Sequence, residues 1–428
     1  MKSKRFVFLV CAVCAVALGV PALAQITPVG EELTIGAGRI SSRVSGPVAA
    51  FGENGQVVLV WEAAGRGIVS RRLDAAGRPA GAEVVLAASD SPDGIPFTGP
   101  LTLHRNPAVA ALDQGDFLAI WTEERQHVVA DIFYQRSETL NSLVVAQRFD
   151  RAGRPAGRRS VLSGGGPGLA GSPRVIRLSD GRALAVWTTS EAGAADGIYG
   201  RLLSRRGSPI GPAFRVDSSA GSRGSRPALA AAGDGGFLVA WQGCCDGGGS
   251  GIFARRFQAR AEPAGEAFLV NAVETGDQLW PAVSRSAAGE FLVAWMGPGG
   301  TFSELEQRIY GQVLSVDGAF LGPELTLSGG GGKAHGAPAV TGVGAGYLVA
   351  WTVWGTNFPQ GIRAAEFDSA GAPQGDLVPL STGRIGIQWQ LSLAGDGDGR
   401  FLAAWEGFDG DGDPSINTRR LSKAEPDV

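Results

Sequence analysis

Residues 234–241 read DGGFLVAW, and a run of this kind, small and apolar and ending in Trp, occurs seven times in the chain. Such self-similarity is typical of a fold built from one repeated supersecondary unit. Because alternate side chains of a strand point to opposite faces, Phe237, Val239 and Trp241 share one face, and we interpret the repeated Trp as a packing residue. The runs end at Trp61, Trp121, Trp187, Trp241, Trp295, Trp351 and Trp405, at spacings of 60, 66, 54, 54, 56 and 54 residues.

Three further short strands accompany each Trp run. A strand is predicted to begin 13 to 15 residues before the Trp, usually at a Pro, which a sheet tolerates as the first residue of a strand. These starts are Pro47, Pro107, Pro173, Pro227, Pro281 and Pro338, with Gln390 in the seventh copy. A third strand such as 197–201 follows the Trp, then a turn such as 74–81 and a fourth strand such as 266–270. Four short strands in about 55 residues are typical of a β-propeller blade.

The two ends of the chain favour a closed ring over an open solenoid. The seventh copy reaches its third strand, 417–421, and has no fourth. Residues 28–35, PVGEELTI, resemble the fourth strand at 321–327, LGPELTL, and supply the missing piece. We therefore predict an all-β, seven-bladed β-propeller of four-stranded blades, in which the N-terminal strand completes the last blade and protects the sheet edges.

Composition excludes several classes of protein. The chain has 428 residues, with 66 Gly and 24 Pro, both of which are poor in helix interiors, so a helical bundle is excluded. The formal net charge of −3 gives neither the basic footprint of a nucleic-acid-binding protein nor a polybasic membrane patch. We expect no nucleic-acid partner, and a monomer.

The N-terminus has the pattern of a secretory signal peptide. Lys2, Lys4 and Arg5 are followed by an apolar stretch at 6–20, which is shorter than the roughly 20 residues of a membrane span. The sequence Ala-Leu-Ala at 22–24 fits a small-x-small cleavage site. We predict cleavage near Ala24, a single propeller domain over 25–428, no membrane span, and a secreted or periplasmic location.

Only two cysteines follow the predicted cleavage site, the adjacent Cys244 and Cys245. A disulfide framework is therefore excluded. A disulfide between neighbours is strained, because their Cα atoms lie about 3.8 Å apart. Two interpretations stay open, a disulfide that stiffens a loop tip and a pair of unpaired thiols.

Residues 234–270 also carry a family resemblance. They resemble the repeats of bacterial secreted propeller proteins, whose pattern is DGGF, a hydrophobic residue and VAW, followed by DGxGIYARRFDxxGxPxGxEFxVN. The resemblance extends over nearly the whole chain after residue 24, and it implies the propeller fold and export. It implies no activity, because these proteins share no established one. Sialidase S-x-D-x-G-x-x-W boxes and paired G-H and W-D motifs do not occur in the sequence.

Aromatic and basic residues are predicted to gather on one face of the ring. The loops before the innermost strands and after the Trp runs share that face, and variable loops on a rigid scaffold commonly bind ligands. Residues predicted at the starts of the innermost strands are Gly46, Asn106, Ser172, Arg226, Trp280, Ala337 and Trp389. We expect ligand contacts from Arg226, Trp280, His335, Trp354 and Trp389. The alternative is that these rings fill gaps between loops.

Two carboxylates are weak catalytic candidates. Glu62 and Glu406 each follow a Trp of the repeated run, and ring closure makes their blades neighbours. A glycosidase needs two carboxyl groups about 5 to 9.5 Å apart. Solvated acids at strand ends are the alternative interpretation, and the three His residues show no catalytic spacing.

An acidic segment is the one candidate for a metal site. Asp409, Asp411 and Asp413 alternate with Gly, as oxygen ligands do in calcium loops. Pro414 and Arg420 stand where an EF-hand needs Gly and Glu, so a plain acidic turn stays open as well. We expect no other cofactor.

Taken together, these features predict an exported, non-catalytic propeller that binds a glycan or a protein through its loop face. One alternative is a glycoside hydrolase or lyase that uses Glu62 and Glu406. Another is a purely structural surface module.

Overall fold

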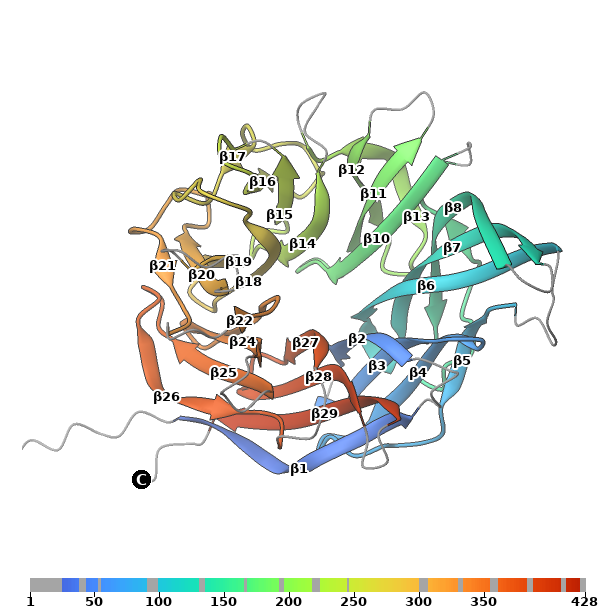
Figure 1. The fold of residues 1–428 in the computed structure, drawn as a ribbon, viewed down its shortest axis with the longest axis horizontal. Coiled ribbons are helices and arrows are strands. Elements are labelled where there is room, and N and C mark those ends of the chain that lie inside the picture. The colour runs from blue at the N-terminus through green and yellow to red at the C-terminus, as the bar shows by residue number, and fades with distance from the viewer. Residues whose placement is uncertain are drawn as a thin grey trace, which may run out of the picture.

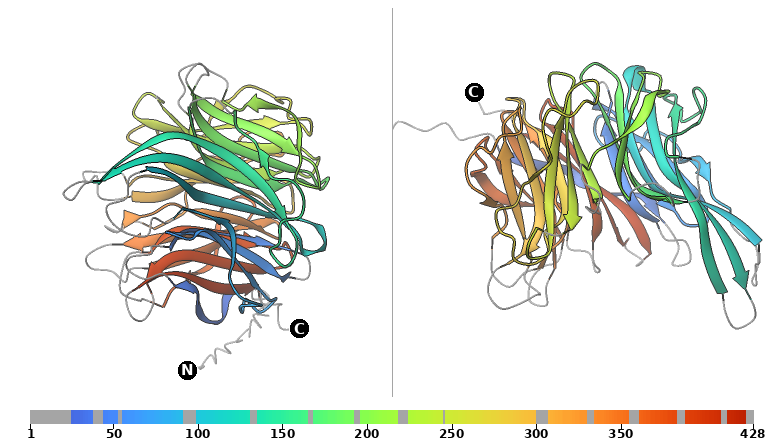
Figure 2. Two further views of the ribbon diagram at one scale, coloured as in Figure 1. Left: turned by 90° about the vertical axis from the view of Figure 1, so that its right-hand side faces the viewer. Right: turned by 90° about the horizontal axis from the view of Figure 1, so that it is seen from above.

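The structure is a computed structural model, and its strands are arranged radially in a ring, with one strand of each sheet nearest the centre (Figure 1). Figure 2 shows the same ring from two further sides, with a strand pair projecting beyond it. The structure describes residues 25–37, 44–52, 55–90, 99–130, 135–164, 168–191, 196–217, 224–244, 246–299, 307–329, 334–354, 361–382, 388–408 and 413–423.

Five sheets are four strands wide, and their strand order runs from the innermost strand outward. The first two contain β2 (Val44–Phe51), β3 (Val57–Ala63), β4 (Gly67–Leu73) and β5 (Val84–Ala88), and β14 (Ser225–Ala231), β15 (Phe237–Cys244), β16 (Ser250–Phe257) and β17 (Phe268–Leu269). The third contains β18 (Leu279–Arg285), β19 (Phe291–Pro298), β20 (Gln307–Leu314) and β21 (Leu325–Thr326).

In the fourth of these sheets the innermost strand is split into two pieces. Its strands are β22 (Ala334–His335) and β23 (Ala339–Val343), which both pair with β24 (Gly346–Trp354), then β25 (Gly361–Phe367) and β26 (Pro373–Pro379). The split falls at Pro338, which has no N–H to donate to the ladder.

The fifth sheet joins the two ends of the described chain. It contains β27 (Trp389–Gly395), β28 (Arg400–Phe408), β29 (Pro414–Lys423) and β1 (Ile26–Ala37). The first strand pairs antiparallel with the last, from Ile26 opposite Lys423 to Ala37 opposite Ser415. This pairing confirms that the N-terminal strand completes the last sheet.

The prediction of seven separate four-stranded blades is wrong. The structure has five blades four strands wide, and the second and third repeats form one eight-stranded sheet. Its strands are β6 (Gly99–Ala111), β7 (Phe117–Ala130), β8 (Gln135–Phe149), β9 (Ser160–Val161), β10 (Gly168–Arg177), β11 (Ala183–Glu191), β12 (Gly197–Leu203) and β13 (Pro209–Arg215), with a short 3₁₀ turn η2 (Asp113–Gly115).

The link between the two repeats explains the merger. Leu169 at the start of β10 pairs in parallel with Ser142 of β8. The Ser142 hydroxyl accepts a hydrogen bond from Ala170 N at 2.9 Å and donates one to Ala170 O at 2.7 Å. The spacing of the Trp runs carries no sign of these bonds, because they join residues on the two sides of a repeat boundary.

The repeated Trp residues are the core of the ring. All seven are at most 2 % exposed, which confirms their interpretation as packing residues. Trp61, for example, belongs to an apolar cluster that also contains Leu402 and Ala404, so the first and last sheets pack together across the closure. Burial of a large apolar side chain contributes about 1.5–3 kcal/mol, so the repeated Trp runs stabilise each junction between sheets.

A polar residue after the fourth strand fixes the third strand in five repeats. Asn271 Oδ1, for example, accepts a hydrogen bond of 2.7 Å from Ile252 N, and Ser381 Oγ accepts one of 2.9 Å from Ile362 N. Ser163, Asp217 and Ser328 do the same for Val144, Ile198 and Ile309. The bond satisfies a buried backbone donor, near the start of the strand in four of these repeats and in the middle of β8 at Val144.

Candidate functional site

Six innermost strands contain a β-bulge near the same end. The register of β14 against β15, for example, shifts between Ser225 and Ala228. The residue in the middle of each shift has a positive φ, a conformation that is costly for residues with a side chain. These residues are Gly46 (62°), Asn106 (51°), Ser172 (49°), Arg226 (51°), Trp280 (53°) and Gln390 (49°). We call these six residues the bulge ring. A bulge re-aims a side chain, and such strained residues cluster at functional sites.

In the seventh repeat the bulge residue lies one position later than the sequence analysis predicted. Trp389 lies opposite Glu406, as Ser45 lies opposite Glu62, so Gln390 and not Trp389 is the equivalent of Arg226. The repeat has no Pro at this point of the strand, so nothing in the sequence marks the bulge. A Cβ built on Gly46 would lie 3.2 Å from Gln390 Oε1, so Gln390 reaches the neighbouring member of the ring. The side chain of Trp389 lies outside the described residues.

Two predicted ligand residues contact each other in the bulge ring. The guanidinium carbon of Arg226 lies 5.1 Å from the centre of the Trp280 ring, within the range of a cation–π interaction. Trp280 is partly buried against an apolar cluster of its own and the following sheet, whereas Arg226 is exposed. The rigid indole therefore holds the guanidinium in place, and partial loss of hydration beside the neighbouring protein lowers the pKa of Arg226.

A second arginine, Arg174, was missed from the sequence. It lies on the innermost strand β10 two residues after Ser172, and its side chain is exposed. Surrounding protein nevertheless removes part of its hydration and lowers its pKa, and the charge of Arg226 lowers the pKa further. One feature of the sequence could have identified Arg174. The residue directly after the Pro is uncharged in the other repeats, where it is Val48, Ala108, Ala228 or Ala282, and is charged only in the third repeat.

In the first, second and last repeats, carboxylates follow the repeated Trp, on the strand next to the bulged innermost strand. Burial raises the pKa of Glu62, and the hydrogen bond of 3.3 Å from Asn106 N and the charge of Arg105 act in the opposite direction. The charges of Glu124 and Glu406 raise the pKa of Glu62 further, so the two predicted catalytic candidates lie within each other's field. Glu406 is 5 % exposed.

A buried polar cluster beside them was also missed. Glu123 is 5 % exposed and forms an ion pair with Arg159, and Nε2 of His104 lies 3.6 Å from Glu123 Oε2. The His104 ring meets Trp121 edge-on, with 6.1 Å between ring centres. Burial lowers the pKa of His104, although the Glu123 carboxylate acts to raise it. Enclosure of the cluster indicates a structural role in the longer strands β6 and β7.

The structure places two other predicted ligand residues apart from the arginines. His335 is 3 % exposed, and its Nδ1 lies 2.9 Å from Ser328 Oγ while its ring meets Trp351 edge-on. Trp354 ends β24 and covers Gly336, where a Cβ would lie 2.6 Å from the indole. Trp354 packs within its own blade, whereas His335 joins its blade to Ser328 of the preceding repeat.

The predicted metal and disulfide residues are only partly described. Asp409, Asp411 and Cys245 lie outside the described residues, so calcium binding and the bonding state of the cysteine pair stay predictions. Asp413 precedes β29 and Cys244 ends β15. Across the described ranges no cluster of three or more His, Cys, Asp or Glu side chains could hold a metal ion. Within the same ranges no helix is long and apolar enough to cross a membrane.

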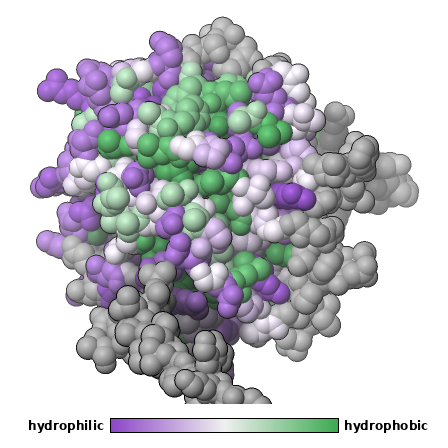
Figure 3. Space-filling view, turned by 90° about the vertical axis from the view of Figure 1, so that its left-hand side faces the viewer, coloured by the Kyte–Doolittle hydropathy of each residue, from purple (hydrophilic) through white to green (hydrophobic). Residues whose placement is uncertain are grey.

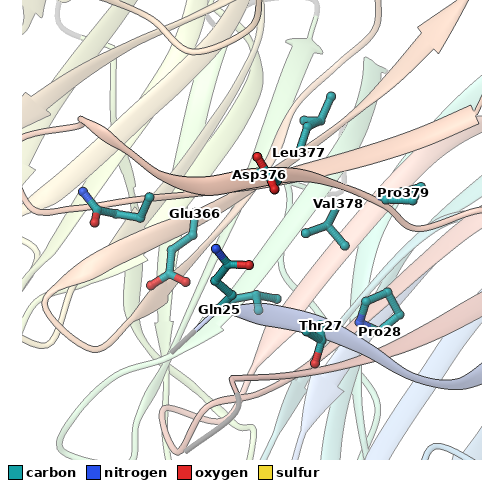
Figure 4. Close-up of a pocket in the computed structure, with 10 residues that line it drawn as sticks. Gln25, Thr27, Pro28, Glu366, Asp376, Leu377, Val378 and Pro379 are labelled. Atoms are coloured by element: carbon teal, nitrogen blue, oxygen red, sulfur yellow. The ribbon is translucent and has the colours of Figure 1, made fainter. Parts of the chain in front are cut away.

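A pocket of about 180 Å³ lies between the outer strands β1 and β26 (Figure 4). Gln25, Thr27 and Pro28 line one side, and Glu366, Asp376 and Val378 lie on the other. Because β1 and β26 are the outermost strands of their sheets, this pocket is at the periphery of the ring. It is separate from the bulge ring on the innermost strands.

Apolar side chains are also exposed on the outer turns. Figure 3 shows hydrophobic surface near the middle of the face on the left of Figure 1. Phe320, on the connection between β20 and β21, is 50 % exposed and meets Phe268 edge-on, with 5.7 Å between ring centres. Phe320 lies on an outer connection of its sheet and is separate from the bulge ring on the innermost strands.

Comparison with known proteins shows the fold and no family. No known protein family and no curated protein matches the sequence. A structure from Dyadobacter fermentans, described as a protein of unknown function, has a TM-score of 0.51 at 11 % identity, with 93 % of this chain and 99 % of that chain covered. A structure described as a polysaccharide lyase, PL25 ulvan lyase, has a TM-score of 0.54 at 10 % identity and covers 90 % of this chain and 95 % of its own. The same lyase bound to -[GlcA(1-4)Rha3S]- gives 0.52 at 9 % identity, with 90 % of this chain and 95 % of that chain covered.

Proposed function

We propose that this chain is an exported glycan-binding protein without catalytic activity, whose ligand binds at the bulge ring. The observation that carries the proposal is the pairing of Trp280 with Arg226 at 5.1 Å on neighbouring innermost strands. A binding site needs an apolar surface and a few fixed polar groups. Trp280 supplies the apolar surface, and Arg226 is one of the fixed polar groups.

Other members of the bulge ring add hydrogen-bonding groups suited to sugar hydroxyls. Asn106 and Gln390 each carry an amide with donors and an acceptor, and both side chains are exposed. Ser172 adds a hydroxyl on the strand next to Arg226. The ring thus combines one aromatic surface with polar groups from several sheets, which suits a flat, hydroxyl-rich ligand better than an apolar one.

The structural neighbours support the same ligand class. Two of them are described as a polysaccharide lyase, one with a bound saccharide, and they share the overall fold with this chain. At 9–10 % identity they support the choice of glycans as the first ligands to test and nothing finer. The signal-peptide pattern of residues 1–24 supports export, which puts extracellular and periplasmic polysaccharides within reach.

A retention experiment tests the proposal. The purified exported chain is passed over a panel of insoluble and immobilised polysaccharides. We expect retention on at least one polysaccharide, with retention lost in Trp280→Ala and reduced in Gln390→Ala. Phe320→Ala is the matched control, because Phe320 is an exposed aromatic residue on the outer turns and is expected to change nothing.

The variants need a fold check, since Trp280 also packs against its blade. Circular dichroism and thermal unfolding identify any variant that fails to fold, and Gln390→Ala keeps the test valid because Gln390 is exposed. Retention by no polysaccharide would overturn the proposal and favour a protein ligand or a structural module.

A second function is favoured by one observation at Glu62. Burial and the charges of Glu124 and Glu406 raise its pKa, as a general acid of a glycoside hydrolase or lyase requires. Glu406 would then be the second carboxylate. If the retained polysaccharide is degraded, loss of turnover in a Glu62→Gln, Glu406→Gln double variant with binding intact would establish this function. Intact turnover in that variant would exclude these two residues as the catalytic pair.

A further inference from the structure

Arg174 and Arg226 form a pair of like charges on neighbouring innermost strands. They lie on β10 and β14, which contact each other, and both side chains are exposed. In agreement with this placement, the charge of Arg226 lowers the pKa of Arg174. Within the described residues, neither guanidinium makes an ion pair, and the polar contacts there are Arg174 Nη1 to Pro173 O at 3.0 Å and Arg226 over Trp280.

Several other arginines on the strands are compensated by a carboxylate. Arg256 Nη2 binds both oxygens of Asp234, at 2.8 and 2.7 Å, and Arg148 Nη2 lies 2.5 Å from Asp116 Oδ2. Two guanidinium groups on neighbouring strands repel each other, and a bound anion relieves this repulsion. No carboxylate of the described chain does so, which leaves the position open to an anion from outside.

We propose that Arg174 and Arg226 bind the oxyanion group, a carboxylate or sulfate, of an acidic saccharide whose ring lies beside Trp280. The inference rests on the proposed glycan-binding function and names its ligand class. Guanidinium groups are planar and bind carboxylates and sulfates through paired hydrogen bonds. Within the described residues the Arg226 guanidinium makes no hydrogen bond or ion pair, so its N–H donors are available for such bonds.

The carboxylates of the bulge region orient such a ligand. Glu62 lies on β3, Glu124 on β7 and Glu406 on β28, in the first, second and last repeats, and the charges of Glu124 and Glu406 act on Glu62. The two arginines lie in the third and fourth repeats. An acidic saccharide is therefore attracted at one side of the ring and repelled at the other, so its charged group is directed to Arg174 and Arg226.

Calorimetric titration of the purified exported chain tests the inference with matched probes. Oligogalacturonate is compared with its uncharged methyl ester, and dextran sulfate with dextran. We expect the better of the two charged probes to bind at least ten-fold tighter than its neutral counterpart, and 0.5 M NaCl to weaken that binding. Arg174→Gln and Arg226→Gln are each expected to remove the preference, and Arg226→Lys to keep part of it because the charge remains.

The control variant is Arg177→Gln. It removes the same charge from the same strand, but Arg177 forms an ion pair with Asp113. It is expected to leave the preference unchanged. The comparison of the two charged probes shows whether a carboxylate or a sulfate is the preferred group.

A second measurement separates this inference from the proposed function. Inorganic sulfate is expected to raise the Tm of the wild-type chain and of Arg177→Gln, and to have a smaller effect on Arg174→Gln and Arg226→Gln. Stabilisation of this kind without binding of any saccharide would support the oxyanion site and contradict the glycan function. Equal binding of charged and neutral saccharides, unchanged in both arginine variants, would overturn the inference and leave glycan binding in place. Equal binding of polyglutamate and oligogalacturonate would also overturn it, in favour of an acidic protein ligand.

Discussion

The Thr34 hydroxyl donates a hydrogen bond of 2.9 Å to Asn417 Oδ1, across a sequence separation of 383 residues. Thr34 lies on the first strand and Asn417, which is 1 % exposed, on the last. Glu32 of the same first strand accepts hydrogen bonds of 2.8 Å from both N and Oγ1 of Thr382, at the end of the preceding repeat. The first strand is therefore tied by side chains to two successive repeats as well as by its backbone ladder.

We expect Thr34→Val to destabilise the ring closure. The variant keeps the shape of the side chain but leaves the buried Asn417 Oδ1 without the hydroxyl donor, which costs about 1–3 kcal/mol. The free energy of unfolding in urea measures the effect. Thr326→Val is the matched control, because Thr326 holds the equivalent place on β21 and is exposed, and it is expected to change stability by less than about 0.5 kcal/mol. Equal effects of the two variants would show that the closure bond contributes nothing.

The raised pKa of Glu62 predicts that this carboxylate makes folding stability fall as pH rises. Because the pKa of Glu62 is raised above its ordinary value of 4.5, the folded state binds a proton more readily than the unfolded state. Stability from this group is then complete below pH 4.5 and is lost as pH rises through the raised pKa. We expect Glu62→Gln to raise Tm at pH 7 by about 1–3 °C. Thermal unfolding of both proteins from pH 4 to pH 8 gives the comparison, and a Tm difference that does not grow with pH would contradict the prediction.

The lowered pKa of His104 predicts the opposite effect, a stability that falls as pH falls. Burial lowers its pKa below the ordinary 6.5, so the folded state favours the neutral ring. Its contribution to stability is present above pH 6.5 and is lost as pH falls through the lowered pKa. A His104→Gln variant is expected to lose less Tm than wild type between pH 7.5 and pH 5. A parallel decline in both proteins would mean that the Glu123 carboxylate compensates the charged ring fully.

The polar residue after the fourth strand gives a fourth prediction. Ser381→Ala removes the acceptor of the Ile362 N–H, at a side chain that is 6 % exposed, and is expected to cost about 1–3 kcal/mol. Ser204→Ala is the control: Ser204 Oγ also accepts a backbone hydrogen bond, 3.1 Å from Ser208 N, but in an exposed turn where water replaces it. Urea unfolding of the two variants tests the difference, and a smaller loss for Ser381→Ala than for Ser204→Ala would contradict it.

The repeated pattern predicted most of the fold because its causes are local. Alternation of apolar residues and Gly at turns act within a few neighbours, so the approximate places of the strands and the buried Trp residues could be predicted from the sequence. The predicted strand starts at Pro47, Pro107, Pro173, Pro227 and Pro281 were wrong: these strands begin before the Pro, which lies beside the bulge inside the strand. The pairing of the first strand with the last could also be predicted, because residues 28–35 match a strand that the last repeat lacks. The number of separate blades could not, since the Ser142 and Ala170 bonds that merge two repeats cross a boundary.

The candidate site, like the fold, could be predicted only in part from the sequence. The sequence by itself determined which residue types stand at the inner strand starts, and with them the aromatic and basic character around Arg226 and Trp280. Only the tertiary structure decided that Arg174 approaches Arg226, that Gln390 and not Trp389 takes the bulge position, and that His335 is buried. The physical reason is that strand register depends on hydrogen bonds between neighbouring strands, and a shift of one residue turns a side chain to the other face. Contacts between side chains of different repeats depend on how the ring closes, which no single repeat encodes.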